Sequence, residues 1–148
     1  MKLNKLLLGC AAVVLLTGCS SLKKVDYDKF HEQAVAAHDK GHSYKTASVS
    51  GTIKDGSTTT KIDKMTFTYT TTLGLKAWVP DDGSSAIIAL VLNADASTVG
   101  NSDSRTYYAG GGFKVEDKET KDTAVYNAAG LVTSMSGDGY KYTVKYSK

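Results

Sequence analysis

The sequence contains little cysteine, proline or tryptophan. Cysteine occurs only at positions 10 and 19, so the rest of the chain has no disulfide and its fold depends on a hydrophobic core. A single proline, Pro80, leaves long strands uninterrupted, and the 14 glycines supply tight turns. Together with nine tyrosines and many threonines and serines, this composition predicts an antiparallel sheet.

The sequence also lacks a strong net charge. Its formal charge is +3, and removal of residues 1–18, which include Lys2 and Lys5, leaves 16 basic and 15 acidic side chains. This balance excludes the broad basic surface that binds nucleic acid. About 130 residues then remain, enough for one hydrophobic core and too few for two domains.

Motifs for catalysis and for cofactors are missing as well. There is no Gly-x-Ser-x-Gly motif, and Glu32, Glu116 and Glu119 do not have the spacing of an acid–base pair. The glycine run 110–112 precedes a predicted strand, whereas a phosphate loop precedes a helix, so a bulge or sharp bend is expected there. We therefore expect a protein that is not an enzyme and holds no cofactor.

The N-terminus has the pattern of an export signal. A basic start, residues 1–5, precedes an apolar run from Leu6 to Leu16 that is too short to span a bilayer. The run ends in Leu16-Thr17-Gly18-Cys19, which resembles the lipobox of bacterial lipoproteins. An alternative box, Leu7-Leu8-Gly9-Cys10, has a bulky leucine where a smaller residue is typical and would leave almost no apolar run.

The lipobox resemblance implies that a signal peptidase recognises Leu16, Thr17 and Gly18, removes residues 1–18, and leaves Cys19 with a diacylglyceryl group. Two or three acyl chains, such as palmitate, give stable anchoring in a bilayer. Ser20 resembles a sorting signal for the outer membrane. We expect an extracytoplasmic protein whose acyl anchor lies in the lipid of the cell membrane or the outer membrane.

Two segments follow the predicted cleavage site. Residues 19–25 form a lipidated tether, and residues 26–148 form a single α+β domain. The domain begins with a helix over Tyr27–Lys40, because Asp26 is a good N-cap residue and Gly41 is a typical end signal. Apolar side chains recur at helical spacing on one face of this helix: Tyr27, Phe30, Ala34 and Ala37.

Alternating apolar and polar residues predict the strands. One strand covers residues 47–54, and a longer one runs from 62 to 75 and on toward Trp78. The predicted inner face of the longer strand consists of Met65, Phe67, Tyr69, Thr71, Leu73 and Leu75. Further strands are expected at 106–115, interrupted by the glycine run, and in hairpins over 123–135 and 131–146. The apolar segment 86–92 fits a helix or a buried strand, and the alanines after it favour the helix.

These elements predict a helix packed on a curved antiparallel sheet. The order of elements resembles that of the LolA/LppX-like lipid-carrier superfamily. It consists of the lipobox, the first helix, the long strands and a short second helix around residues 85–96. This resemblance implies an incomplete barrel around an apolar cavity.

Three histidines are candidate metal ligands. His31, His38 and His42 would share one face of an uninterrupted helix, and histidines four residues apart can bind a metal. However, Gly41 is expected to end the helix before His42, and no cysteine or well-spaced carboxylate completes a ligand set. We therefore expect no metal site.

Aromatic side chains give the best indication of a binding surface. Amphipathic rings on a sheet suit both stacking and hydrogen bonding, although they are also typical of an ordinary core. The residues expected to face a ligand are Phe67, Tyr69, Trp78, Leu90 and Tyr142. We favour a membrane-anchored binding or accessory module for an apolar or amphipathic ligand. The alternative is a structural lipoprotein with a fully packed core that meets an envelope protein or the cell wall.

Overall fold

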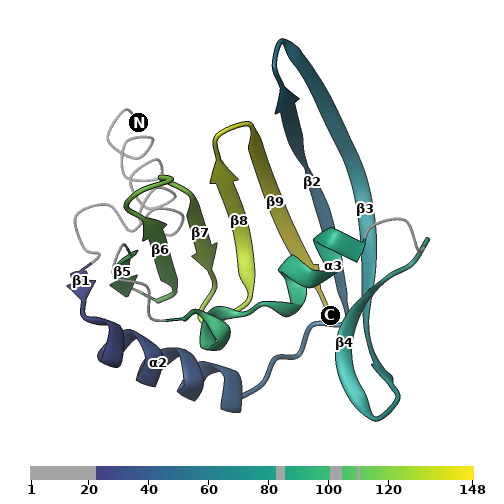
Figure 1. Ribbon diagram of the computed structural model, residues 1–148. Helices are drawn as coiled ribbons and strands as arrows, with labels where there is room; N and C mark the ends of the chain where they lie inside the picture. The colour runs from purple at the N-terminus through teal and green to yellow at the C-terminus, as the bar shows by residue number, and fades with distance from the viewer. Residues whose placement is uncertain (1–22, 83–85, 101–104, 110) are drawn as a thin grey trace, which may run out of the picture.

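The fold is built on one curved antiparallel sheet. The computed structural model describes residues 23–82, 86–100, 105–109 and 111–148, so the predicted signal peptide and lipobox lie outside the described residues. Nine strands follow one another in the order β1-β5-β6-β7-β8-β9-β2-β3-β4, and Figure 1 shows how they curve into a half-barrel. The strands are β1 (Lys23–Val25), β2 (Thr46–Asp55), β3 (Thr58–Thr72), β4 (Leu75–Pro80), β5 (Arg105–Ala109), β6 (Phe113–Asp117), β7 (Thr123–Tyr126), β8 (Val132–Gly137) and β9 (Tyr140–Ser147).

Two crossovers run over the inner face of the sheet. Helix α2 (Tyr27–Asp39) leads from β1 at one edge to β2. Helix α3 (Ala86–Asn93) and the short 3-10 helix η2 (Ala96–Thr98) lead from β4 at the other edge back to β5. Side chains from both crossovers and from the sheet form one buried core. The expected α+β fold, with a helix on a curved antiparallel sheet and a second short helix, is confirmed (Figure 1).

Helix α2 forms where its end signals predict. The Asp26 carboxylate accepts a hydrogen bond from the Lys29 amide at 2.9 Å and so caps the first turn. The helix ends at Asp39, one residue earlier than expected, and Gly41 then adopts a φ of +68°. Its buried stripe consists of Phe30, Ala34 and Ala37. This stripe attaches the helix to the core and directs the C-terminal end of α2 toward the β3–β4 side of the sheet (Figure 1).

The long strand predicted toward Trp78 is a hairpin. Strand β3 ends at Thr72, the chain reverses at Leu73-Gly74, and β4 pairs back onto β3 from Leu75. The apolar alternation continues across the turn without a break. For that reason the period-2 pattern predicts one strand where the backbone forms two.

The predicted inner face of β3 is confirmed in its first half and wrong in its second. Three of its residues are buried or half-buried: Met65, Phe67 and Tyr69. Leu73 and Leu75 are instead 99% and 73% exposed, because the turn carries them to the hairpin tip.

The turn at this tip carries backbone strain. Both of its residues have a positive φ, +52° at Leu73 and +80° at Gly74, and a left-handed conformation costs a bulky residue about 1–2 kcal/mol. We expect Leu73→Asn to raise the free energy of unfolding by about 1 kcal/mol, because Asn-Gly is a preferred pair in two-residue hairpin turns. Urea denaturation measures this gain.

The matched control for this substitution is Leu75→Asn. It removes a similar exposed apolar side chain from a strand residue whose φ is not positive, so it should give no gain in stability. An equal gain from both variants would assign the effect to exposed apolar surface and would contradict the strain at Leu73.

The chain reverses between β5 and β6, so of the bulge or sharp bend expected at the glycine run 110–112, the bulge within one strand is wrong. Strands β5 and β6 pair antiparallel with Ala109 opposite Phe113, which makes this segment a hairpin turn. Gly111 has a φ of +78°, and a Cβ atom at Gly112 would clash with the carbonyl oxygen of Tyr126. Gly110 itself lies outside the described residues.

The other expected elements are confirmed, with one extension. Segment 86–92 lies in a helix, and the C-terminal hairpins are formed by β7, β8 and β9. The extension concerns residues 23–25, which the sequence places in the tether. They form β1 and pair with Tyr107, Tyr108 and Ala109 of β5. The sheet therefore begins only a few residues after the predicted acylated cysteine.

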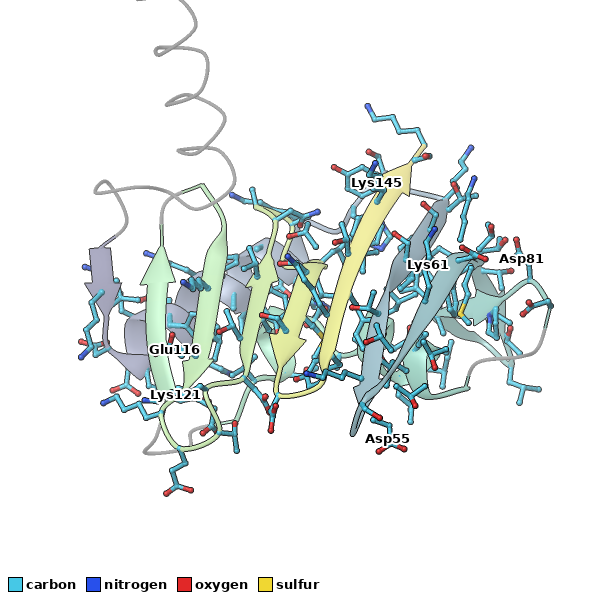
Figure 2. The ribbon with its side chains drawn as sticks, turned by 90° about the horizontal axis from the view of Figure 1, so that it is seen from above. Asp55, Lys61, Asp81, Glu116, Lys121 and Lys145 are labelled. Carbon is cyan, nitrogen blue, oxygen red and sulfur yellow. The ribbon has the colours of Figure 1, made fainter. Side chains whose placement is uncertain are left out.

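Charged side chains of both signs are spread along the sheet. Figure 2 shows Glu116 and Lys121 on the β6–β7 side, Lys61 and Asp81 on the β3–β4 side, and Lys145 on β9. These labelled charges do not gather into a patch of one sign.

Candidate ligand-binding cleft

A cleft opens where four parts of the chain meet. It has a volume of about 290 Å³ and lies between the C-terminal end of α2, the β3–β4 hairpin, the α3–η2 connection and the β7–β8 turn. We call it the His42 cleft, and its lining is formed by His38, Gly41, His42, Tyr69, Lys76, Trp78, Leu92, Asn93, Asp95, Ala129 and Leu131. This volume is close to the lower limit of pockets that hold small molecules, which is about 300 Å³.

One wall of the cleft is aromatic. Tyr69 on β3 and Trp78 on β4 are directly opposite each other, and their ring centroids are 5.0 Å apart. The His42 ring lies 4.3 Å from Tyr69 and 5.6 Å from Trp78, and its plane is within 12° of the indole plane. Trp78 is buried, whereas His42 and Tyr69 are half-buried. A ligand would therefore meet the rings of His42 and Tyr69.

Two further tyrosines support this wall from behind. The Tyr146 ring lies 5.3 Å from Trp78 and 5.4 Å from Tyr44. The Tyr146 hydroxyl donates a hydrogen bond to the Val132 carbonyl oxygen at 2.6 Å. Burial, with a smaller contribution from Tyr44, raises the pKa of Tyr146 well above its usual value. The hydroxyl therefore stays protonated at neutral pH and keeps the aromatic wall attached to β8.

His42 is the least satisfied polar group of the cleft. Its Nδ1 atom is buried and has no hydrogen-bond partner in the described structure. Burial lowers the pKa of His42, and the positive charges of Lys76 and His38 lower it further. A hydrogen bond with the Tyr44 backbone and the charge of the Asp95 carboxylate act in the opposite direction and are outweighed. His42 is therefore neutral at pH 7, with one ring nitrogen as donor and the other as acceptor.

A hydrogen-bond contact between His38 and Asp95 closes the rim between α2 and η2. His38 Nδ1 lies 2.7 Å from Asp95 Oδ2, and the other Asp95 oxygen accepts hydrogen bonds from the backbone N–H and the hydroxyl of Ser97. Both carboxylate oxygens are thus engaged. The Ser97 hydroxyl bonds to the carboxylate and not to the imidazole, so this pair orients η2 and does not activate a serine nucleophile.

Asn93 seals the edge of the sheet next to the cleft. Strand β4 is an edge strand, and its Trp78 N–H donates to Asn93 Oδ1 at 2.8 Å. Asn93 Nδ2 donates in return to the Trp78 carbonyl at 3.1 Å and to the Ala89 carbonyl at 2.8 Å. The side-chain amide thus supplies the donor and acceptor that a neighbouring strand would supply.

Lys76 brings a positive charge to the cleft without a carboxylate partner. It is exposed on β4, and its ammonium group is close enough to His42 to lower the pKa of the imidazole. Lys76 takes no part in the His38–Asp95 or the Lys61–Asp63 contact of the described ranges. A negatively charged group could therefore bind there without displacing a protein carboxylate.

A second, apolar cavity beneath α3 is almost closed. Its volume is about 30 Å³, the space of one or two water molecules. It is lined by Val49, Ile88, Val91, Leu92, Met135, Tyr142 and Val144. Helix α3 therefore packs tightly onto β2, β8 and β9, and an acyl chain would not fit beneath it in this conformation.

The structure brings only some of the predicted ligand-facing residues together. Tyr69 and Trp78 line the His42 cleft, and Tyr142 lines the small apolar cavity. Phe67 is fully buried in the core, and Leu90 is 71% exposed on α3. Neither of these two is among the described lining residues of a cavity.

The three histidines separate because α2 ends before His42. His38 and His42 both line the cleft, whereas His31 stacks on Tyr27 at 5.6 Å between ring centroids. Over the described ranges, no group of three or more His, Cys, Asp or Glu side chains is arranged to hold a metal ion. His42 thus belongs to an aromatic cluster, which its sequence spacing from His38 does not reveal.

Four residues of the cleft have no clear signal in the sequence: Lys76, Asn93, Asp95 and Leu131. Asn93 is the polar residue that ends an apolar helix, and Asp95 is the N-cap of the Ala96–Thr98 turn, but neither feature indicates a cleft. Their role depends on the β4–α3 and α2–η2 contacts, which join residues far apart in the chain.

The lowered pKa of His42 predicts a loss of stability on mild acidification. Below about pH 6.5 the unfolded chain binds a proton on this histidine that the folded protein does not bind. Stability should therefore fall as the pH decreases from 6.5 toward the folded-state pKa, with no contribution above 6.5. Thermal denaturation between pH 7.5 and 5.5 should show a shallower decrease for His42→Gln than for the unsubstituted protein.

The control for this pH dependence is His31→Gln. His31 stacks on Tyr27 outside the cleft, so this variant controls for the removal of a histidine as such. If His42→Gln has the same slope as the unsubstituted protein, the imidazole of His42 is not desolvated in the folded state.

No protein-family model, curated protein or solved structure matches this chain. Within the described residues, no helix is both long enough and apolar enough to cross a bilayer. The functional conclusion therefore depends on the cleft and on the N-terminal sequence.

Proposed function

We propose that this protein is an extracytoplasmic lipoprotein that binds a small amphipathic ligand in the His42 cleft and does not catalyse a reaction. The observation that carries the proposal is the cleft itself, where an aromatic wall faces polar groups and the buried Nδ1 atom of His42 has no partner. Native proteins pair nearly all of their buried polar atoms, so an unpaired one requires an explanation. A ligand that turns the His42 ring and brings Nδ1 to the cleft surface would supply the missing partner.

The sizes of the two cavities favour a compact ligand over a whole lipid. The apolar cavity beneath α3 is too small for an acyl chain, and the larger cleft combines apolar and polar walls. A flat apolar part of the ligand would pack against Tyr69 and Leu131, with a polar part toward Lys76. The sequence leaves the class of ligand open between apolar and amphipathic, and we propose the amphipathic class because the cleft has both apolar and polar walls.

Attachment to the membrane through Cys19 is the second part of the proposal. Residues 20–22 separate this cysteine from the start of β1 at Lys23. An extended chain covers about 3.5 Å per residue, so β1 would begin on the order of 15 Å from the acylated cysteine. Such a short connection favours a ligand that is taken up or released close to the bilayer.

Mass spectrometry of the membrane fraction tests the anchor. We expect a mature N-terminus at Cys19 that carries acyl mass, and we expect Cys19→Ala to remain unprocessed. Cys10→Ala is the matched control and should be processed and acylated normally. A soluble product that begins elsewhere, or normal processing of Cys19→Ala, would contradict the lipid anchor.

Native mass spectrometry of the full chain, purified from its own envelope in a non-ionic detergent, tests ligand binding. We expect a bound small molecule that is lost from Tyr69→Ala and retained by Thr70→Ala, a substitution of the next, exposed residue on β3. A protein that carries no small molecule under these conditions would count against the binding module and in favour of the structural class.

One observation favours that structural class. Leu73 and Leu75 expose large apolar side chains at the β3–β4 tip, and such groups on a small domain can mark contact with a partner protein. Photo-crosslinking from position 73 in intact cells would test this role. One specific crosslinked envelope protein, together with an empty cleft, would replace the binding proposal by an interaction role.

A further inference from the structure

Among the charged groups that line the His42 cleft in the described structure, the one without a partner of opposite charge is positive. The acceptors of the rim are engaged: Asp95 binds His38 and Ser97, and Asn93 Oδ1 binds the Trp78 N–H. The Lys76 ammonium group has no carboxylate partner in the described part of the chain. A ligand that enters the cleft therefore meets a free cation and no free anion.

His42 extends this preference into the interior of the cleft. Its Nδ1 atom is buried without a partner, and the neutral imidazole can gain a proton. The groups that face it are Lys76 from β4, His38 from α2, Asp95 from the α3–η2 connection, Tyr69 from β3, and the ring and backbone of Tyr44. A ligand anion beside this ring would favour the imidazolium form, whose two N–H groups are both donors.

The remaining lining sets the shape of the ligand. Tyr69 offers an aromatic ring on one side, and Leu92 and Leu131 offer aliphatic side chains. The volume of about 290 Å³ accommodates a body the size of a single ring or a short aliphatic chain.

We infer that the His42 cleft binds a small amphipathic carboxylic acid, with its carboxylate between Lys76 and His42 and its apolar body against Tyr69, Leu92 and Leu131. This inference rests on the proposed binding function of the cleft and adds the chemical class of the ligand. It also requires that binding of the carboxylate is accompanied by uptake of a proton on His42.

The tryptophan of the cleft reports on occupancy. Trp78 is the only tryptophan in the sequence, and its indole lies 5.6 Å from the His42 ring. The experiment uses the full chain in non-ionic detergent and follows Trp78 fluorescence with four probes: phenylacetate, hexanoate, 2-phenylethanol and 2-phenylethylamine. We expect saturable changes with both acids, and at least tenfold weaker binding of the alcohol and the amine.

Variants identify the groups that recognise the carboxylate. Lys76→Met should weaken phenylacetate binding at least tenfold without a matching effect on 2-phenylethanol, and Lys64→Met, an exposed substitution on β3, should have no effect. Calorimetry of phenylacetate binding at pH 7.5 in two buffers of different ionisation enthalpy should show net proton uptake, and His42→Gln should abolish it.

Three results would overturn the inference. The first is equal affinity for the acid and the alcohol, and the second is full affinity for phenylacetate in Lys76→Met. The third is the absence of any fluorescence change with either acid. In each case native mass spectrometry still decides the proposed function, because a neutral or cationic molecule found in the cleft would preserve ligand binding and reject only the carboxylate.

Discussion

Replacement of Phe67 by alanine is expected to lower the free energy of unfolding by about 3–5 kcal/mol. Phe67 is completely buried at the centre of the core, between Ala47 on β2 and Pro80 on β4. Truncation would remove most of its apolar contacts and leave a cavity that the surrounding sheet cannot close. A typical domain is stable by about 5–15 kcal/mol, so this one change would threaten folding at 37 °C.

Urea denaturation followed by Trp78 fluorescence measures this loss. Thr70→Ala is the matched control, because Thr70 is an exposed residue of the same strand and its replacement should change stability by less than about 0.5 kcal/mol. An unchanged midpoint for Phe67→Ala would mean that this face of β3 is solvated and that the register of β3 is shifted by one residue.

The second large effect on stability is expected for the substitution Asn93→Leu. Leucine has a similar size and a higher helix propensity, but it cannot bond to the Trp78 N–H and carbonyl groups. Trp78 is buried, so its backbone N–H and carbonyl groups would each cost about 1–3 kcal/mol when left without a partner. Pairing of this edge of β4 with another chain would restore the lost hydrogen bonds. We therefore expect a lower free energy of unfolding together with concentration-dependent association.

Chemical denaturation and light scattering measure these two effects. Ala94→Leu is the control, because it adds a similar apolar side chain at the neighbouring exposed position without breaking the Asn93 bonds. Association of both variants to the same extent would assign the effect to added apolar surface. An Asn93→Leu variant that stays stable and monomeric would show that the side-chain amide does not protect the edge of β4.

The local elements of this fold are well predicted from the sequence. Helix α2 has a clear N-cap at Asp26, an apolar stripe at helical spacing and a glycine end signal, and these local features agree with one another. Strand β9 alternates cleanly because one face packs on the core and the other meets water, and β2 does so over residues 46–49, whereas Ile53 near its end is exposed. Each of these signals depends on residues that lie close together in the sequence, within a single helix or strand and its ends.

The sequence predicts less where local signals conflict or are absent. The turn at Leu73-Gly74 is hidden because leucine is an unusual residue for a positive φ and because the apolar alternation continues through it. The His42 cleft combines the end of α2 with β3, β4, the α3–η2 connection and the β7–β8 turn, and no single stretch indicates that they meet. The sequence predicts Tyr69 and Trp78 as aromatic residues of a binding surface, and both line the cleft, whereas Asn93 and Asp95 acquire their positions only from tertiary contacts.

The position of β1 also has a mechanical consequence. β1 is a three-residue edge strand held to the sheet by β5 alone, and it is the part of the domain nearest to the proposed anchor. Tension between the membrane and the domain would act on the end of β1 and break its pairing with β5 one residue pair at a time. β1 would detach first and lengthen the tether, while β9, between β8 and β2, would keep the interior of the sheet together.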